Sequence, residues 1–209
     1  MVTFLTAISG IAWSIVYIEL IRKGFKDKVC GMPLFALGLN FAWELIYSID
    51  TGLSGHFNVQ EIANISWFIL DAVILFTYFK FEKKNFPAKA QKYFMPFSIL
   101  SVASCFVIQL AFYFHFKGIP AAQYSAFAQN AAMSIMFLTA LYTRNTTKGQ
   151  TMLMAVAKWI GTLAPAIQMG IIQDFNIYIV LMGVICSIFD IIYIIQLRKF
   201  KLGEKAKKS

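Results

Sequence analysis

The chain has 209 residues, of which 59% are hydrophobic and only 14% are charged, and its mean hydropathy is +0.66. A soluble domain has about 25% charged residues, so this composition excludes an ordinary soluble domain and predicts an all-α membrane protein. The formal net charge is +9. The basic residues lie in short segments between apolar runs, which argues against nucleic acid as a partner.

Seven apolar runs are long enough to cross a bilayer, for which about 17–25 residues suffice. The expected transmembrane helices are residues 2–21, 32–52, 62–80, 94–115, 121–142, 150–170 and 175–197. The first run has no basic segment before it and no small-residue cleavage site, so it is expected to be retained. Residues 1–197 then form one transmembrane domain, and residues 198–209 form a basic cytoplasmic tail.

Lysine and arginine follow every second span. Four follow the first span, five the third and two the fifth, and six lie in the tail, which makes 17 of the 19 basic residues; Lys117 lies on the opposite side and Lys158 inside a span. The positive-inside rule then places the N-terminus outside and the C-terminus in the cytoplasm. We expect a multi-pass protein of the cell membrane or the endoplasmic reticulum membrane, with the lipid bilayer as its surroundings.

A weak internal repeat is visible. The segment KGFKDKVCGMPLF before the second span resembles TRNTTKGQTMLM before the sixth, with Gly31 and Gly149 in register. The third and seventh spans both carry a central aspartate. With the fourth span as a linker, this pattern predicts two parallel three-helix units in a 3+1+3 arrangement. In this register Glu44 falls opposite Thr162.

Ionisable residues at membrane depth are candidate functional residues by default, because burying a charge there is costly. They are Glu44, Asp71, Lys158 and Asp190. Rings and amides accompany the acids by helical spacing or come from the fifth span; these are Asn40, Trp43, Tyr47, Trp67, Gln129, Asn130 and Tyr193. A cavity lined by rings with a few polar anchors is typical of a small-molecule site, so these seven residues, with Asp71 and Lys158, are candidate substrate-binding residues.

A buried carboxyl group favours its protonated form and can therefore act as a general acid. Glu44 and Asp190 are the candidates for this role. The alternative is that the acids pair with Lys158 or with amides and only hold helices together. Glu19, near the end of the first span, is expected to pair with Arg22.

Metal and cofactor sites are not indicated. The two histidines are far apart, the three cysteines lack metal-ligand spacing and are expected to be packing residues, and no DDxxD or DxDD stretch occurs. We therefore expect no cofactor and no metal.

The segment LNFAWELIY, preceded by KDKVCGMPLFALG, resembles the integral-membrane terpene cyclases of the pyripyropene and paspaline type, which act in meroterpenoid and indole-diterpene pathways. The matching features are Asn40, Trp43-Glu44, the Gly31-Met32-Pro33 lead-in and, by position, Asp190 in SIFDIIY. Helix number and length resemble this family over the whole chain, but the specific part is roughly residues 26–48.

The resemblance implies metal-independent cyclisation of a prenyl chain that often carries a terminal epoxide. A carboxylic acid protonates the epoxide, the polyene closes through carbocations, and a deprotonation ends the cascade. Glu44 is then the principal acid, and Asp190 assists it or stabilises the cation. Lys158 is not part of the family pattern; if it pairs with Asp190, only Glu44 remains as proton donor. The partner is a hydrophobic prenylated small molecule.

A small transporter of the SWEET or PQ-loop kind is the alternative interpretation, because it would share seven helices and the 3+1+3 repeat. No proline-glutamine pair occurs, however, and the first and fifth spans lack central prolines. A cyclase is expected to show a closed, ring-lined pocket with Glu44 and Asp190 facing each other. A transporter is expected to show a polar passage.

Overall fold

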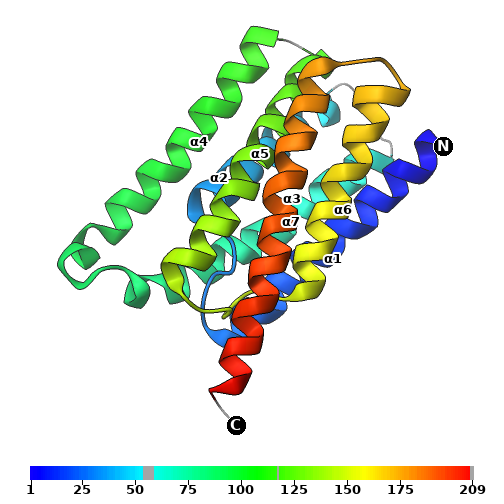
Figure 1. The fold of residues 1–209 in the computed structure, drawn as a ribbon. Helices are drawn as coiled ribbons and strands as arrows, with labels where there is room; N and C mark the ends of the chain where they lie inside the picture. The colour runs from blue at the N-terminus through cyan, green and yellow to red at the C-terminus, as the bar shows by residue number, and fades with distance from the viewer. Residues whose placement is uncertain (54–58, 117, 208–209) are drawn as a thin grey trace.

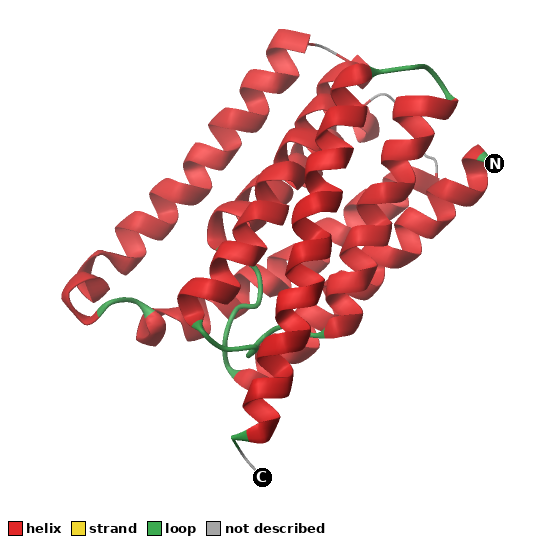
Figure 2. Cartoon of the chain, viewed as in Figure 1, coloured by secondary structure: helices red, strands yellow, loops and turns green. Residues whose placement is uncertain are grey.

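The computed structural model describes residues 1–53, 59–116 and 118–207, and in this part of the chain every regular element is a helix (Figure 2). The α-helices are α1 (Val2–Asp27), α2 (Leu34–Leu53), α3 (Val59–Phe81), α4 (Phe94–Phe116), α5 (Gly118–Arg144), α6 (Met152–Ile167) and α7 (Ile177–Ala206). Two 3-10 helices, η1 (Glu82–Asn85) and η2 (Ala88–Tyr93), join α3 to α4, and a π-helix, η3 (Gln168–Ile172), extends α6. The all-α prediction is confirmed.

Five helical segments of the described chain are long and apolar enough to cross a membrane. They are Val2–Asp27, Ile62–Asn85, Ala88–Phe116, Met152–Ile172 and Ile177–Ala206. The other two long helices, α2 and α5, are outside this set, and they carry buried polar side chains such as Asn40, Glu44 and Gln129. Several membrane helices are thus present, and the crossing of the membrane by all seven stays a prediction.

The helices extend beyond the apolar runs. Helix α1 continues past Arg22 to Asp27, where Lys23 and Asp27 form an ion pair of 2.6 Å one turn apart. It ends at Lys28, whose φ of 55° is left-handed. Helix α7 likewise continues to Ala206, so most of the predicted tail is helical. Hydropathy therefore marks the apolar part of each helix rather than its end.

The third helix of each predicted triplet packs against the other two. Helix α3 contacts α1 and α2, and α7 contacts α5 and α6 (Figure 1). Between the triplets, α1 packs on α6 and α2 packs on α5, while α4 lies along α2 and α5 at the side of the bundle. This order of contacts is what a 3+1+3 repeat predicts, and the repeat itself stays a prediction.

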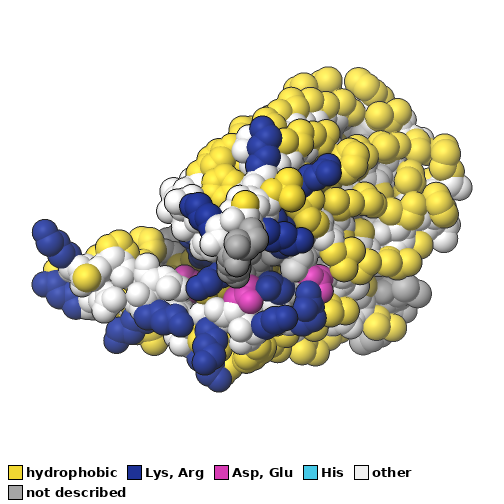
Figure 3. All heavy atoms as spheres, turned by 60° about the horizontal axis from the view of Figure 1, so that its bottom comes forward, with side chains coloured by type: hydrophobic (Ala, Val, Ile, Leu, Met, Phe, Trp, Pro, Cys, Tyr) yellow, Lys and Arg dark blue, Asp and Glu magenta, His cyan; other side chains and the backbone are white. Residues whose placement is uncertain are grey.

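Basic side chains gather at one end of the bundle. Figure 3 looks onto the end that carries the C-terminus and shows lysine and arginine side chains spread over it, with hydrophobic side chains along the flank. Lys117 and the last residues of the tail, 208–209, lie outside the described residues. The orientation of this end toward the cytoplasm stays a prediction.

The two glycines that the sequence places in register contact each other. A Cβ atom on Gly31 would lie 2.2 Å from the carbonyl oxygen of Gly149, whose own φ is +78°. Two hydrogen bonds flank this contact: the Gly149 N–H donates to Asp27 Oδ2 at 2.8 Å, and Arg144 Nη1 donates to the Cys30 carbonyl at 2.6 Å. The α1–α2 and α5–α6 connections are therefore held backbone to backbone.

Gly31→Ala is expected to lower the free energy of unfolding by about 1–3 kcal/mol, the usual cost of overpacking, because the new methyl group meets a backbone oxygen. Gly10→Ala is the matched control, since a Cβ on Gly10 would meet nothing within 4 Å. Unfolding of both variants in detergent, followed by circular dichroism, measures the difference. Equal stability of the two variants would contradict the contact.

Candidate active site

Helix α2 presents Asn40 and Glu44 one turn apart on the same buried face. The amide nitrogen of Asn40 donates to Glu44 Oε1 at 3.0 Å and to Asp71 Oδ2 of α3 at 2.9 Å. Glu44 is 2% exposed and Asp71 is fully buried. Three polar side chains that the sequence marked as candidates therefore meet where α2 packs on α3.

Tyr17 of α1 completes this group, although it is not among the residues that the sequence analysis selected. Its hydroxyl donates to Glu44 Oε1 at 2.5 Å and lies 2.6 Å from the Asn40 amide nitrogen. The available signal was weak: Trp13 and Tyr17 are one turn apart in an apolar helix, a pattern that usually means packing. The contact of Tyr17 with Glu44 depends on how α1 packs in the bundle, which hydropathy does not reveal.

Amides from two more helices extend the network. Gln129 of α5 donates to Asn40 Oδ1 at 3.0 Å, and Gln109 of α4 donates to Gln129 Oε1 at 2.7 Å. Gln129 was a sequence candidate, and its contact with Asn40 confirms that it lies beside the acids. With both Asn40 oxygen and nitrogen engaged, the amide is fixed in one orientation, and it holds Glu44 Oε1 and Asp71 Oδ2 at fixed positions.

The two carboxyl groups are joined through Asn40, whose amide nitrogen donates to one oxygen of each. No N–H or O–H group of the described residues reaches Glu44 Oε2 or Asp71 Oδ1. The salt bridges found in that part of the chain include neither residue. The network therefore consists of two carboxyl groups with uncharged donors around them.

Aromatic rings lie next to this network. The centroid of the Tyr17 ring lies 6.1 Å from that of Trp13 and 6.2 Å from that of Trp67. The planes of the Tyr17 and Trp67 rings make an angle of 28°. The Trp67 indole N–H donates to Ser14 Oγ of α1 at 3.2 Å rather than to Asp71. The acid of α3 and the rings of α1 and α3 are thus part of one packed cluster.

A second pair of aromatic candidates lies on α2 itself. The rings of Trp43 and Tyr47 are 5.0 Å apart, and the Trp43 indole donates to the Ala122 carbonyl at 3.0 Å. The Tyr47 hydroxyl lies 3.5 Å from Ser125 Oγ. These two side chains connect α2 to α5 on the side of the helix next to Glu44.

Asp190 belongs to a separate cluster. Its Oδ1 accepts from Lys158 Nζ at 2.7 Å, Lys158 also donates to Ser134 Oγ at 2.7 Å, and both charged side chains are fully buried. Glu44 and Asp190 thus have different hydrogen-bond partners, and the expectation that they face each other across a pocket stays a prediction. The predicted pairing of Lys158 with Asp190 is present. Ser134 was not selected from the sequence.

Two further candidates lie near the ion pair. The buried ring of Tyr193 is 5.7 Å from Phe137, and Lys158 Nζ lies 5.8 Å above the same Phe137 ring. The Asn130 carbonyl accepts a hydrogen bond from Ser134 Oγ at 3.0 Å. Tyr193 and Lys158 thus share the Phe137 ring as a neighbour, and Asn130 contacts Ser134 through its backbone.

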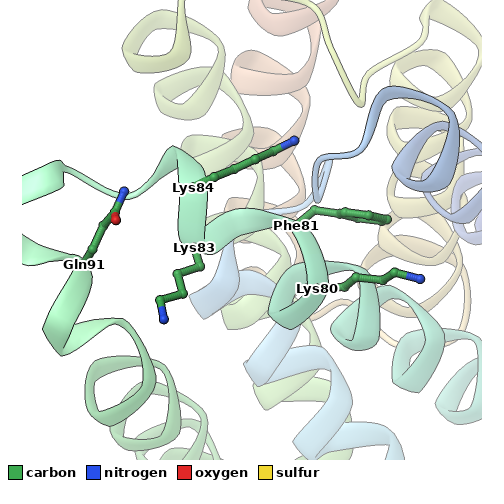
Figure 4. A pocket seen from close by; sticks show the side chains of 5 residues that line it. All are labelled: Lys80, Phe81, Lys83, Lys84 and Gln91. Atoms are coloured by element: carbon green, nitrogen blue, oxygen red, sulfur yellow. The ribbon is translucent and has the colours of Figure 1, made fainter.

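Surface hollows lie away from both clusters. One, of about 360 Å³, is lined by Lys80, Phe81, Lys83, Lys84 and Gln91 at the α3–α4 connection (Figure 4). Another, of about 390 Å³, is lined by Ala111, Phe112, His115 and Phe116 near the end of α4. Neither is the predicted ring-lined pocket, because neither is lined by a buried carboxyl group.

Comparison with known proteins identifies the family. The chain matches the Pyr4-like transmembrane terpene cyclases over residues 1–201. The Pyr4-family terpene cyclase mfmH of Annulohypoxylon moriforme is 30% identical over 160 residues, which cover 74% of this chain and 64% of mfmH. Terpene cyclase andB of Emericella variicolor is 25% identical over 177 residues, covering 84% and 74%. Terpene cyclase pyr4 of Aspergillus fumigatus is 35% identical over 72 residues, covering 34% and 29%.

No solved structure matches the chain. The family match confirms the resemblance that rested on LNFAWELIY, and it gives no support to the transporter interpretation. The chain spans less than two thirds of the length of mfmH and about a third or less of pyr4. The chain therefore belongs to the family of Pyr4-like transmembrane terpene cyclases.

Proposed function

We propose that this protein is a membrane-embedded, metal-independent terpene cyclase that starts the reaction with a proton from Glu44. The observation that carries the proposal is the environment of this residue: a buried carboxyl group that is joined through Asn40 to a second carboxyl group and has uncharged donors around it. Such surroundings favour the neutral, proton-donating form of a carboxyl group. The relatives named as terpene cyclases support the reaction class.

The hydrogen bonds of Glu44 indicate which oxygen donates. Oε1 accepts from the Tyr17 hydroxyl and from Asn40, so the proton of a neutral Glu44 belongs on Oε2. No donor of the described residues reaches Oε2. This oxygen can therefore give its proton to a substrate atom beside it, while Tyr17 and Asn40 hold the carboxyl group in place.

A terminal epoxide is the best substrate group for this acid. Its oxygen takes the proton, one C–O bond breaks to leave a hydroxyl group and a carbocation, and successive alkenes attack to form ring bonds. The last cation loses a proton from a neighbouring carbon to a carboxylate, which restores the acid. Substrate and product are isomers. Rings such as Trp67 and Tyr17 can stabilise the cations through their faces, and exclusion of water prevents quenching.

Of the other candidates, Asn40, Asp71 and Gln129 hold the acid, and Trp43, Tyr47 and Trp67 supply rings for the prenyl chain. Asp190 accepts from Lys158 at Oδ1, so it is not the proton donor of this proposal; its Oδ2, which no donor of the described residues reaches, stabilises the cation. Lys158 binds Asp190, and Asn130 and Tyr193 remain candidates for contact with the substrate.

Turnover by the wild-type protein tests the proposal. Membranes containing the protein are incubated with aromatic compounds carrying an epoxyfarnesyl or epoxygeranylgeranyl chain, beside the same compounds without the epoxide. The expected result is a product of unchanged mass, with fewer alkene signals in its NMR spectrum, from an epoxidised substrate only. Membranes without the protein are the control. No cyclic product from any of these compounds, with the protein folded, would contradict the proposal, and solute uptake into proteoliposomes would then test the transporter interpretation.

A further inference from the structure

The connection between α3 and α4 carries a dense group of cations. Between residues 80 and 92 there are five lysines and one acid, Glu82. Three of these lysines and two further side chains line the surface hollow of about 360 Å³; they are Lys80, Phe81, Lys83, Lys84 and Gln91 (Figure 4). All three lysines are exposed, so their ammonium groups are accessible to a ligand in the hollow.

The acid of this segment does not neutralise the lysines. Glu82 is buried, and its Oε1 accepts from the Cys30 N–H at 2.6 Å while its Oε2 lies 3.6 Å from Arg144 Nη2. The ion pairs found in the described residues include none of the three lysines of the hollow. An anionic ligand in the hollow would therefore not compete with a carboxylate of that part of the chain.

Aromatic rings fix one of these cations. Lys80 Nζ lies 5.8, 5.2 and 5.5 Å from the centroids of the Phe25, Phe76 and Phe81 rings, respectively. Phe25 comes from α1, and its ring meets Phe81 edge-on at 6.1 Å. Cation–π contacts hold an ammonium group near the rings without neutralising its charge. Lys80 therefore keeps its positive charge at a fixed place in the wall of the hollow.

The hollow lies where lipid headgroups are expected. Two apolar segments that are long enough to cross a membrane, Ile62–Asn85 and Ala88–Phe116, meet at this connection. Exposed rings follow the hollow in the chain: Tyr93 is 56% exposed and Phe97 is 51% exposed, and Lys92 Nζ lies 4.8 Å from the Tyr93 ring. Tyrosine is enriched at the membrane–water interface, and lysines gather on its cytoplasmic side. These surroundings favour a lipid over a soluble anion.

We propose that this hollow binds the phosphate group of an anionic phospholipid, with the phosphate held by Lys80, Lys83 and Lys84 and the acyl chains along the exposed apolar side chains of α4. Ammonium groups bind phosphate oxygens through charge-assisted hydrogen bonds, which are stronger than neutral ones. None of the residues that line the hollow belongs to the hydrogen-bond networks of Glu44 or Asp190. The inference is therefore independent of the proposed function.

Native mass spectrometry of the purified protein in detergent tests the site. Dioleoyl phosphatidic acid is titrated, and the fraction of protein that carries one lipid gives an apparent Kd. The hollow variant, Lys80→Gln/Lys83→Gln/Lys84→Gln, is compared with a tail variant, Lys199→Gln/Lys205→Gln/Lys207→Gln, which removes the same charge from exposed lysines of the tail. The hollow variant is expected to raise Kd about tenfold or more, since each lysine near an anionic headgroup strengthens binding by roughly fivefold. The tail variant is expected to bind nearly as tightly as the wild type.

Two further ligands identify the source of the phosphate. Dioleoyl phosphatidylcholine has no net charge and is expected to bind more weakly than phosphatidic acid. Glycerol 3-phosphate, which is the same headgroup without acyl chains, is expected not to bind at the lipid concentrations used. If circular dichroism shows that the hollow variant does not fold, Lys83→Gln/Lys84→Gln replaces it. This variant keeps Lys80 in its ring cage and is expected to have an intermediate Kd.

An unchanged Kd in a folded hollow variant would overturn the proposal, and so would an equal loss of affinity in the tail variant, because surface charge alone would then explain binding. Glycerol 3-phosphate that binds as tightly as the lipid would identify a soluble phosphate as the ligand instead. Equal binding of phosphatidylcholine would show that the lysines do not recognise the phosphate charge.

Discussion

Glu44→Gln is expected to lower kcat by roughly 10²- to 10⁴-fold, the usual contribution of a general acid. The replacement has the same shape, and its amide oxygen can still accept from Tyr17 and Asn40, which bind Glu44 Oε1 in the wild type. What it lacks is the proton on the second oxygen. The substrate and the ring-lined surroundings remain, so KM is expected to change little. Initial rates of cyclic product, measured at several substrate concentrations in membranes with equal amounts of protein, give both constants.

Glu19→Gln is the matched control for this substitution. Glu19 is also buried, at 8% exposure, but it lies on α1 and its carboxyl group binds Arg22 at 2.7 and 2.9 Å. Its replacement should leave kcat within about twofold, because its carboxyl group is tied to a cation and does not belong to the Glu44 network. Turnover at the wild-type rate by Glu44→Gln would show that another group supplies the proton.

Asp190→Asn is expected to be the most destabilising single substitution considered, at about 3–5 kcal/mol of unfolding free energy. It leaves the ammonium group of Lys158, which is fully buried, without its balancing charge. The double variant Lys158→Met/Asp190→Asn removes both charges and is expected to recover most of this loss, since replacing a whole buried ion pair is often neutral. Denaturant unfolding of the purified proteins in detergent measures both values.

An ion pair with one exposed partner provides the comparison. Arg22 and Glu19 lie 2.7 Å apart, but the Arg22 side chain is 52% exposed, so Arg22→Ala should cost only about 0–1 kcal/mol. If Asp190→Asn were as stable as the wild type, or if the double variant were no more stable than the single one, the ion pair would not be the reason for the burial of Lys158.

Local patterns in the sequence predicted those parts of the site that lie within one helix. Asn40 and Glu44 are one turn apart and do interact, and Glu19 and Arg22 form the expected pair. The all-helical fold follows from composition in the same way. The ends of the helices were harder to predict. The charged residues after Arg22 lower the hydropathy but do not end α1, which continues to Asp27.

Contacts between helices could not be derived in this way. Trp67 is one turn before Asp71, which suggested an interaction, yet its indole donates to Ser14 of α1. Tyr17 was not selected from the sequence, and it binds Glu44. In each case the partner depends on how one helix is rotated about its axis relative to another, and this rotation cannot be derived from a single sequence. The ion pair of Lys158 with Asp190 is a contact between helices that could be predicted, because only a few buried groups carry the negative charge that the lysine needs.

The backbone contact between Gly31 and Gly149 bears on how independently the two halves of the bundle can move. It joins the halves where the α1–α2 and α5–α6 connections meet, and the hydrogen bonds from Gly149 to Asp27 and from Arg144 to Cys30 lie at the same point. Helices α1 and α6 also pack on each other between the halves. A shift of one connection therefore has to displace the other.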